Sequence, residues 1–138
     1  MSTALVLPVA LRAQLEAEAR AAFPSECCGL IEGRTEGDAV VVAALHPTQN
    51  LATAPDRFEI DPAEHVRLLR GLRGTGHEIV GCYHSHPNGR AEPSPRDREG
   101  AAEEGFVWLI AALEAEGAPG LSAHIFVAGG FRPLGLRA

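Results

Sequence analysis

The chain has 138 residues, of which 46% are hydrophobic, and this length and composition fit a single domain with one hydrophobic core over residues 1–138. The formal net charge is −6 and the 12 basic residues, all arginines, are scattered, so the clustered basic face that attracts nucleic acid or an anionic membrane is missing. The longest apolar run, residues 106–113, is far shorter than the roughly 20 residues that span a bilayer.

Apolar spacing and turn residues predict an alternation of helices and strands. After Pro8, Leu11, Leu15 and Ala19 recur at helical spacing, whereas the later short apolar runs are typical of strands. The predicted elements in chain order are a helix over residues 9–22, strands over 27–32 and 39–45 around a turn at 33–38, a loop over 46–56, a strand over 57–60, a helix after Asp61, a strand over 78–84, a helix after Ser94, and strands over 106–113, 122–127 and 131–136.

The helix after Asp61 has a clear start signal, because Asp61 is followed by a proline at the first helical position and by Glu64, in the form of a capping box. Its spacing places Val66, Leu69 and Leu72 on the side that faces the core. The whole order predicts an α/β (α+β) fold in which a mainly antiparallel, mixed sheet is flanked by helices.

Two histidines lie two positions apart at the end of the predicted strand 78–84. Side chains at this spacing leave the same face of a strand roughly 7 Å apart at the backbone, so the rings of His84 and His86 can converge on one ion. Two imidazoles suggest zinc. A structural zinc site usually has four protein ligands with closely spaced cysteines, and the chain has no CxxC pair. The pair therefore favours a catalytic site with three protein ligands and one open position.

Asp97 is the natural third ligand. The turn after His86 brings the chain back, and Ser94 begins a helix whose first turn would hold Asp97 near the histidines. Ser94 and Asp97 also have the form of an N-cap and its capping-box partner, an interpretation that is compatible with a ligand role. A water in the fourth position would have its pKa lowered to about 7. The spacing alone does not locate the group that would take the proton of this water.

The combined pattern resembles the JAMM/MPN+ zinc metalloprotease family. The string HxHPxxxxxxSxxD runs from His84 to Asp97, and Glu26 stands upstream of it in the segment PSECCGL. Asn50, residues 57–62 and the tripeptide that begins at Gly81 also look like the short prokaryotic members. The resemblance covers most of the chain and matches every motif position.

This resemblance implies the cytidine-deaminase-like MPN fold and one zinc ion per chain, bound by His84, His86 and Asp97. It also implies that Glu26 holds the zinc-bound water as general base and then acts as general acid, and that Ser94 donates a hydrogen bond to the oxyanion.

The family resemblance further implies cleavage of the peptide or isopeptide bond after the C-terminal Gly-Gly of a ubiquitin-like protein. A small sulfur-carrier protein of the β-grasp type is the expected substrate, and residues 46–56 are the main candidate for a substrate loop. The chain could also pair as a homodimer, although its sequence leaves the oligomeric state open.

Three other functions use the same residue types. The family includes MPN domains without metal ligands that act as binding or scaffold modules, and zinc content would distinguish these from an enzyme. A zinc deaminase would need His-x-Glu followed by Pro-Cys-x-x-Cys, which the chain does not contain. A cysteine peptidase could use Cys28 with a histidine, and inhibition by a chelator rather than by a thiol reagent would exclude it.

The remaining conspicuous side chains are expected to be structural. Cys27, Cys82 and Trp108 lie in or beside apolar runs and are predicted to pack in the core. Three cysteines do not form an even disulfide framework, and the N-terminus has no basic segment before an apolar stretch, which favours a reducing, cytoplasmic setting. The histidines outside the motif are predicted to be isolated: His46, His65, His77 and His124.

Overall fold

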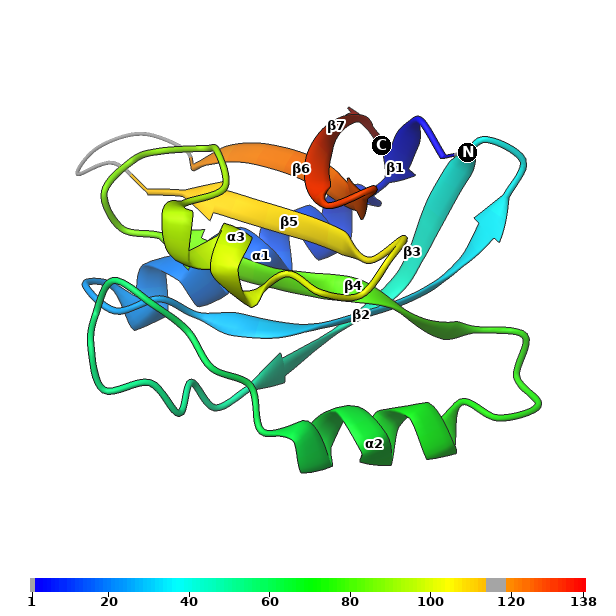
Figure 1. Cartoon of the computed structure of the whole chain (residues 1–138), viewed down its shortest axis with the longest axis horizontal. Helices are drawn as coiled ribbons and strands as arrows, with labels where there is room; N and C mark the ends of the chain where they lie inside the picture. The colour runs from blue at the N-terminus through cyan, green and yellow to red at the C-terminus, as the bar shows by residue number, and fades with distance from the viewer. Residues whose placement is uncertain (1, 114–118) are drawn as a thin grey trace.

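The computed structural model describes residues 2–113 and 119–138, in which a mixed sheet closes into a barrel and three helices pack around it (Figure 1). The strand order around the barrel is β1-β3-β2-β4-β5-β6-β7. The elements are β1 (Ala4–Val6), α1 (Val9–Ala22), β2 (Cys28–Glu36), β3 (Ala39–Thr48), α2 (Pro62–Gly71), β4 (Glu78–His86), α3 (Pro95–Gly100), β5 (Val107–Ala112), β6 (Gly120–Val127) and β7 (Gly130–Arg137).

Strand pairing in the barrel is both parallel and antiparallel, which confirms the predicted mixed α/β class. β2 pairs antiparallel with β3 and β4, and β6 pairs antiparallel with β5 and β7. β4 and β5 are parallel, and β1 closes the barrel by pairing in parallel with both β3 and β7. β4, which carries the histidine pair, therefore has a strand on each side.

The structure differs from the predicted elements at several points, among them the loop predicted over 46–56, whose first residues belong to β3. β1 was not predicted, because three residues are too few to show a periodic pattern. The predicted strand over residues 57–60 is wrong, since this segment is irregular and is fixed by a side-chain stack described below. The predicted turn at 33–38 is also too long. β2 runs on through Glu36, and the chain reverses at Gly37, whose φ of 58° suits glycine.

Each face of the sheet packs against a different helix (Figure 1). On one face, Leu15 and Ala19 of α1 join a core that includes Tyr83 of β4. On the opposite face, Leu68 of α2 packs with Cys82 of β4 and with Trp108, as predicted for core residues. Because side chains alternate along a strand, His84 and His86 lie on the same face as Cys82, which is the α2 face.

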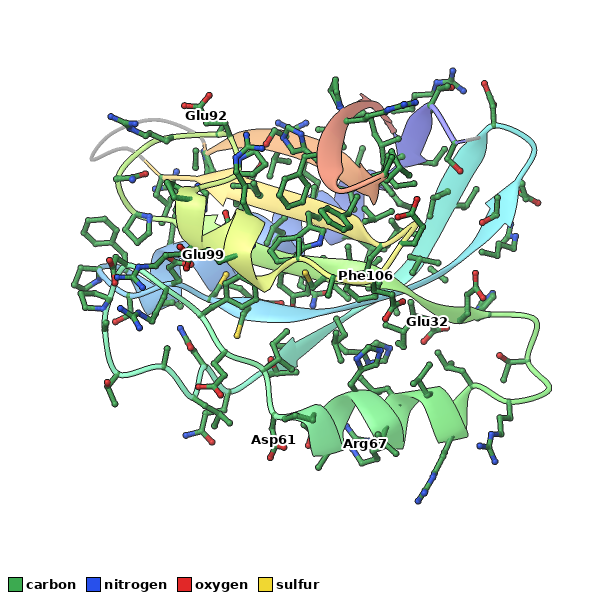
Figure 2. The ribbon with its side chains drawn as sticks, viewed as in Figure 1. Glu32, Asp61, Arg67, Glu92, Glu99 and Phe106 are labelled. Carbon is green, nitrogen blue, oxygen red and sulfur yellow. The ribbon has the colours of Figure 1, made fainter. Side chains whose placement is uncertain are left out.

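α2 begins as the sequence predicts, but only part of its predicted inner side is buried. Asp61 lies where the helix begins (Figure 2), and its carboxylate accepts a hydrogen bond from the backbone N–H of Ala63. Leu68 is buried and Leu72 packs against the same core, as predicted for Leu72, whereas Val66 and Leu69, also predicted to face the core, are each 44% exposed. No helix in the described part of the chain is long and apolar enough to cross a membrane.

Gly81 lets β4 approach β5 closely, and this position offers a test of the fold. A Cβ on Gly81 would collide with the carbonyl group of Val107, its partner in the parallel pair. We expect Gly81→Ala to lower the free energy of unfolding by about 1–3 kcal/mol, measured by denaturant unfolding. Gly120→Ala is the matched control, because a Cβ at Gly120 meets open space. Equal stability of the two variants would contradict this packing.

Candidate metal centre

The side chains of His84, His86 and Asp97 meet at the end of β4. The two Nε2 atoms are 3.0 Å apart, and the Asp97 carboxylate lies 3.1 Å from each of them. All three residues are buried, with exposed fractions of 4% or less. The two histidines and the aspartate of the sequence motif are therefore brought together in space.

The first turn of α3 fixes Asp97. Ser94 is the N-cap residue, and its Oγ accepts a hydrogen bond from the backbone N–H of Asp97 at 3.1 Å. In return, the backbone N–H of Ser94 donates to Asp97 Oδ2 at 2.8 Å. This is the capping box that the sequence predicts, and it directs the same carboxylate toward the histidines. The capping-box prediction is confirmed, and the same carboxylate also contacts both histidines.

Neighbouring groups fix the orientation of both imidazole rings. His86 Nδ1 lies 2.7 Å from the carbonyl oxygen of Arg90, so Nδ1 carries the proton that it donates there. In the neutral ring, Nε2 is then left with a lone pair that faces Asp97. The His84 ring stacks on Phe58, with centroids 4.3 Å apart, and meets Trp108 edge-on. Phe58 explains why residues 57–60 are held in place without belonging to a strand.

Glu26 lies beside the histidine pair but comes from a different part of the chain. It stands two residues before β2, and ligand atoms of Glu26, His84 and His86 all lie within 4.8 Å of one another. Its side chain is 5% exposed, and within the described residues Oε1 has no hydrogen-bond partner. Glu26, His86 and Ser94 line a hollow of about 180 Å³, together with Asp56 and Asn88.

The two carboxylates of the site have opposite pKa shifts. Burial alone would raise the pKa of Asp97, but its contacts with His84 and His86 outweigh this and lower the pKa well below the ordinary value. Burial raises the pKa of Glu26 to about 7.

The pKa values of the two histidines also shift in opposite directions. Burial lowers the pKa of His84, whereas for His86 the contacts with Asp97 and the Arg90 carbonyl outweigh burial and raise the pKa.

These residues fit a divalent transition metal. Two imidazoles and a carboxylate form a donor set that zinc commonly binds, and donors about 2.0–2.1 Å from a tetrahedral ion stand roughly 3.3 Å apart. The contacts of 3.0–3.1 Å among His84, His86 and Asp97 are close to that spacing. The buried Oε1 of Glu26 also needs a partner, because an unpaired buried polar atom is costly.

The sequence did not predict the groups that orient the side chains of the site, and the prediction that His46 and His77 are isolated was wrong. Phe58 lies in a segment that resembles the family, but nothing in the sequence shows that its ring stacks on His84. The contacts of Ser85 and of the Arg90 carbonyl were not predicted either, because they form only in the folded chain. His46 and His77, predicted to be isolated, lie 2.9 and 2.7 Å from the two carboxylate oxygens of Glu32. Glu32 lies on β2, far from α3 and its Glu99 (Figure 2), so this second cluster is separate from the site.

The geometry around Cys28 does not support a thiol nucleophile. Its Sγ lies 3.5 Å from the hydroxyl of Thr48, and burial raises the pKa of the thiol. A nucleophilic cysteine needs the opposite shift, because the thiolate is the reactive form.

Comparison with known proteins identifies the family. A family model described as prokaryotic homologs of the JAB domain matches residues 8–123. The chain therefore belongs to the JAB/MPN family. A desampylase from Haloferax volcanii is 38% identical over 112 residues, which are 80% of this chain and 76% of that protein. A probable TtuB-protein conjugate cleaving protease from Thermus thermophilus is 34% identical over 67% of this chain and 60% of its own length.

Solved structures share the fold of this chain. A protein from Desulfitobacterium hafniense superimposes with a TM-score of 0.84 at 31% identity, over 96% of this chain and 90% of that one. A JAB1/MPN domain protein from Archaeoglobus fulgidus gives a TM-score of 0.56 at 18% identity, over 99% and 98% of the two chains, and so shows the shared fold alone.

Metal binding can be tested through stability. We expect added Zn²⁺ to raise the melting temperature of metal-free protein, because a ligand that binds only the folded state at 100 times its Kd stabilises it by about 2.7 kcal/mol. His86→Ala should abolish this shift in a thermal-unfolding titration. His65→Ala is the matched control, because His65 lies on α2 and its ring packs beside Phe106 rather than at the histidine pair. An undiminished zinc shift in His86→Ala would contradict the site.

Proposed function

We propose that the chain is a zinc-dependent hydrolase that cleaves conjugates of ubiquitin-like proteins at the peptide or isopeptide bond after a C-terminal Gly-Gly. The observation that carries this proposal is the convergence of Glu26, His84, His86 and Asp97 in one buried cluster, with Ser94 on the wall of the adjoining hollow. A scaffold module would not need such a set of buried ionisable groups, which are costly to bury without a role.

The names of the relatives support the substrate class. The Haloferax volcanii relative is named a desampylase, and the Thermus thermophilus relative is named for the cleavage of TtuB-protein conjugates. We extend this to a small sulfur-carrier protein of the β-grasp type, whose glycine tail allows close backbone approach in a narrow hollow. The described cysteines are free thiols, which supports a cytoplasmic setting.

We assign the metal to His84, His86 and Asp97, as one zinc ion per chain. Asp97 is the third ligand because its carboxylate contacts both histidines directly, whereas Glu26 lies farther away and is held by a separate segment. When bound, zinc would polarise the scissile carbonyl and lower the pKa of water. Asp97 suits a ligand role, because its lowered pKa keeps the carboxylate ionised.

Glu26 is the residue that moves the proton. Burial raises its pKa to about 7, so the carboxylate can accept a proton from the attacking water near neutral pH and then release it. As the water oxygen bonds to the carbonyl carbon and the C–N bond breaks, Glu26 passes that proton to the leaving amine. A metal ligand could not do this as readily, because its lone pair is engaged.

Ser94 serves both the helix and the reaction. Its Oγ accepts the N–H of Asp97, which leaves the hydroxyl proton to donate. The residue also lines the hollow beside Glu26 and His86. We propose that this hydroxyl donates to the oxygen on which negative charge develops, a contact that stabilises the transition state more than the ground state.

Glu26→Gln tests the proton-transfer role. The variant should keep its zinc content and melting temperature and lose kcat by at least about 100-fold, because the amide cannot accept the proton. The substrate is a β-grasp carrier extended by residues beyond Gly-Gly, and mass spectrometry reports trimming back to Gly-Gly. Full activity of Glu26→Gln would refute the role. Zinc-loaded wild type that trims no extended carrier would refute the proposed reaction.

Ser94→Ala should lower kcat by about 100-fold through loss of the donated hydrogen bond. Ser94→Thr should restore most of the rate, because threonine caps a helix and keeps a hydroxyl. Asp61→Ala is the matched control, since it removes the N-cap of α2 and should cost about 1 kcal/mol of stability with kcat unchanged. The donor role is wrong if Ser94→Ala retains kcat at equal zinc content.

A further inference from the structure

Glu26 lies in a short segment that belongs to neither neighbouring element. α1 ends at Ala22 and β2 begins at Cys28, so the backbone ladder of the sheet does not fix residues 23–26. Yet the Glu26 side chain is 5% exposed and stands beside His86. Side chains from elsewhere must therefore hold this segment against the end of β4.

Ser85, between the two histidines, makes the first of these contacts. Its backbone N–H donates to the carbonyl of Cys27 at 3.1 Å, and its Oγ accepts the backbone N–H of Cys27 at 2.8 Å. Cys28 pairs with His84 in the antiparallel register, so Cys27 stands opposite Ser85. In a regular antiparallel pair the second bond would go to the backbone carbonyl of Ser85. Here the hydroxyl takes the place of that carbonyl.

This replacement explains how the chain leaves the ladder at Cys27. The hydroxyl oxygen lies away from the backbone of β4, so the Cys27 N–H can point out of the ladder and still be hydrogen-bonded. The backbone of Glu26, the preceding residue, leaves the ladder in the same direction. Because Ser85 is fully buried, water cannot replace its hydroxyl as the acceptor.

Asn50 makes the second contact, from the other side. Its Nδ2 donates to the carbonyl of Glu26 at 3.1 Å and to the carbonyl of Arg57, also at 3.1 Å. Its Oδ1 accepts the N–H groups of Ala52 at 2.9 Å and of Glu59 at 3.0 Å. The amide thereby ties Glu26 to the loop that carries Phe58, the ring stacked on His84.

We propose that Ser85 and Asn50 are positioning residues that together hold the Glu26 carboxylate at the histidine pair. Ser85 sets the backbone on the C-terminal side of Glu26, and Asn50 holds the carbonyl of Glu26 itself. Neither side chain touches the reacting atoms. This inference rests on the proposed function, in which Glu26 transfers the proton, and it assigns two further residues to the same reaction.

Ser85→Ala is the main test. Alanine keeps the N–H that donates to Cys27 but removes the acceptor for the Cys27 N–H. We expect kcat for carrier trimming to fall by about 10- to 100-fold, the effect of a displacement near 1 Å, with KM and zinc content unchanged. In metal-free protein the Cys27 amide should exchange with solvent faster than in wild type. Ser85→Thr, which keeps the hydroxyl, should restore both properties.

Thr75→Ala is the matched control. The Thr75 hydroxyl also accepts a backbone N–H, that of His77 at 3.1 Å, but at the opposite end of β4. Its removal should leave kcat unchanged.

Asn50→Asp provides an independent variant if Ser85→Ala does not fold. It keeps an acceptor for Ala52 and Glu59 but loses both donated bonds, and the same selective loss of kcat is expected.

The outcomes separate this inference from the proposed function. If Glu26→Gln is inactive while Ser85→Ala and Asn50→Asp retain wild-type kcat, the positioning role is overturned and the proposed function stands. A loss of zinc in parallel with activity in these variants would also overturn it, since the residues would then support the metal ligands. If Glu26→Gln retains activity, the proposed role of Glu26 fails, and this inference fails with it.

Discussion

Four ionisable side chains are buried together at the end of β4, and the surrounding structure has to compensate for their loss of water. Glu26, His84, His86 and Asp97 are each 5% exposed or less. Burying such groups is unfavourable unless each has a partner, so their arrangement constrains the elements around them. The capping box of α3, the Arg90 carbonyl and the Phe58 ring each fix one member of the cluster. A metal ion would complete the set by adding positive charge where the donors meet.

The parallel pairing of β4 and β5 explains why this cluster forms at that end of the sheet. Two adjacent parallel strands need a crossover connection, and the crossover begins where the first strand ends. Here it leaves directly after His86 and contains α3, so Ser94 and Asp97 return beside the strand end (Figure 1). The carboxyl ends of strands in such sheets are frequent binding sites for the same reason. The topology therefore places two parts of the motif together through a single crossover connection.

Glu26 was indicated by the family resemblance alone, and the features that residue spacing predicts are those that local chemistry determines. His84 and His86 share a face because of strand periodicity, and Ser94 and Asp97 pair through a capping box four residues long. Features that depend on distant segments were missed. β1 finds its place only through parallel pairing with β3 and β7, and Glu32 of β2 joins His46 of β3 to His77, which precedes β4. The segment at Phe58 has an apolar pattern like that of a strand, but its ring stacks on His84 and the backbone stays unpaired.

The opposite pKa shifts of the two carboxylates support the two different roles proposed for them. Asp97 accepts hydrogen bonds from its own helix turn and contacts both histidines, which lowers its pKa. Glu26 has the same functional group, but burial without comparable partners raises its pKa to about 7. Environments that separate the pKa values of neighbouring acids are typical of sites that divide ligand and proton-transfer roles. The separation depends on Glu26 being held by its own segment, apart from the donors of α3, so the contacts of Ser85 and Asn50 with that segment bear on the chemistry as well as on the fold.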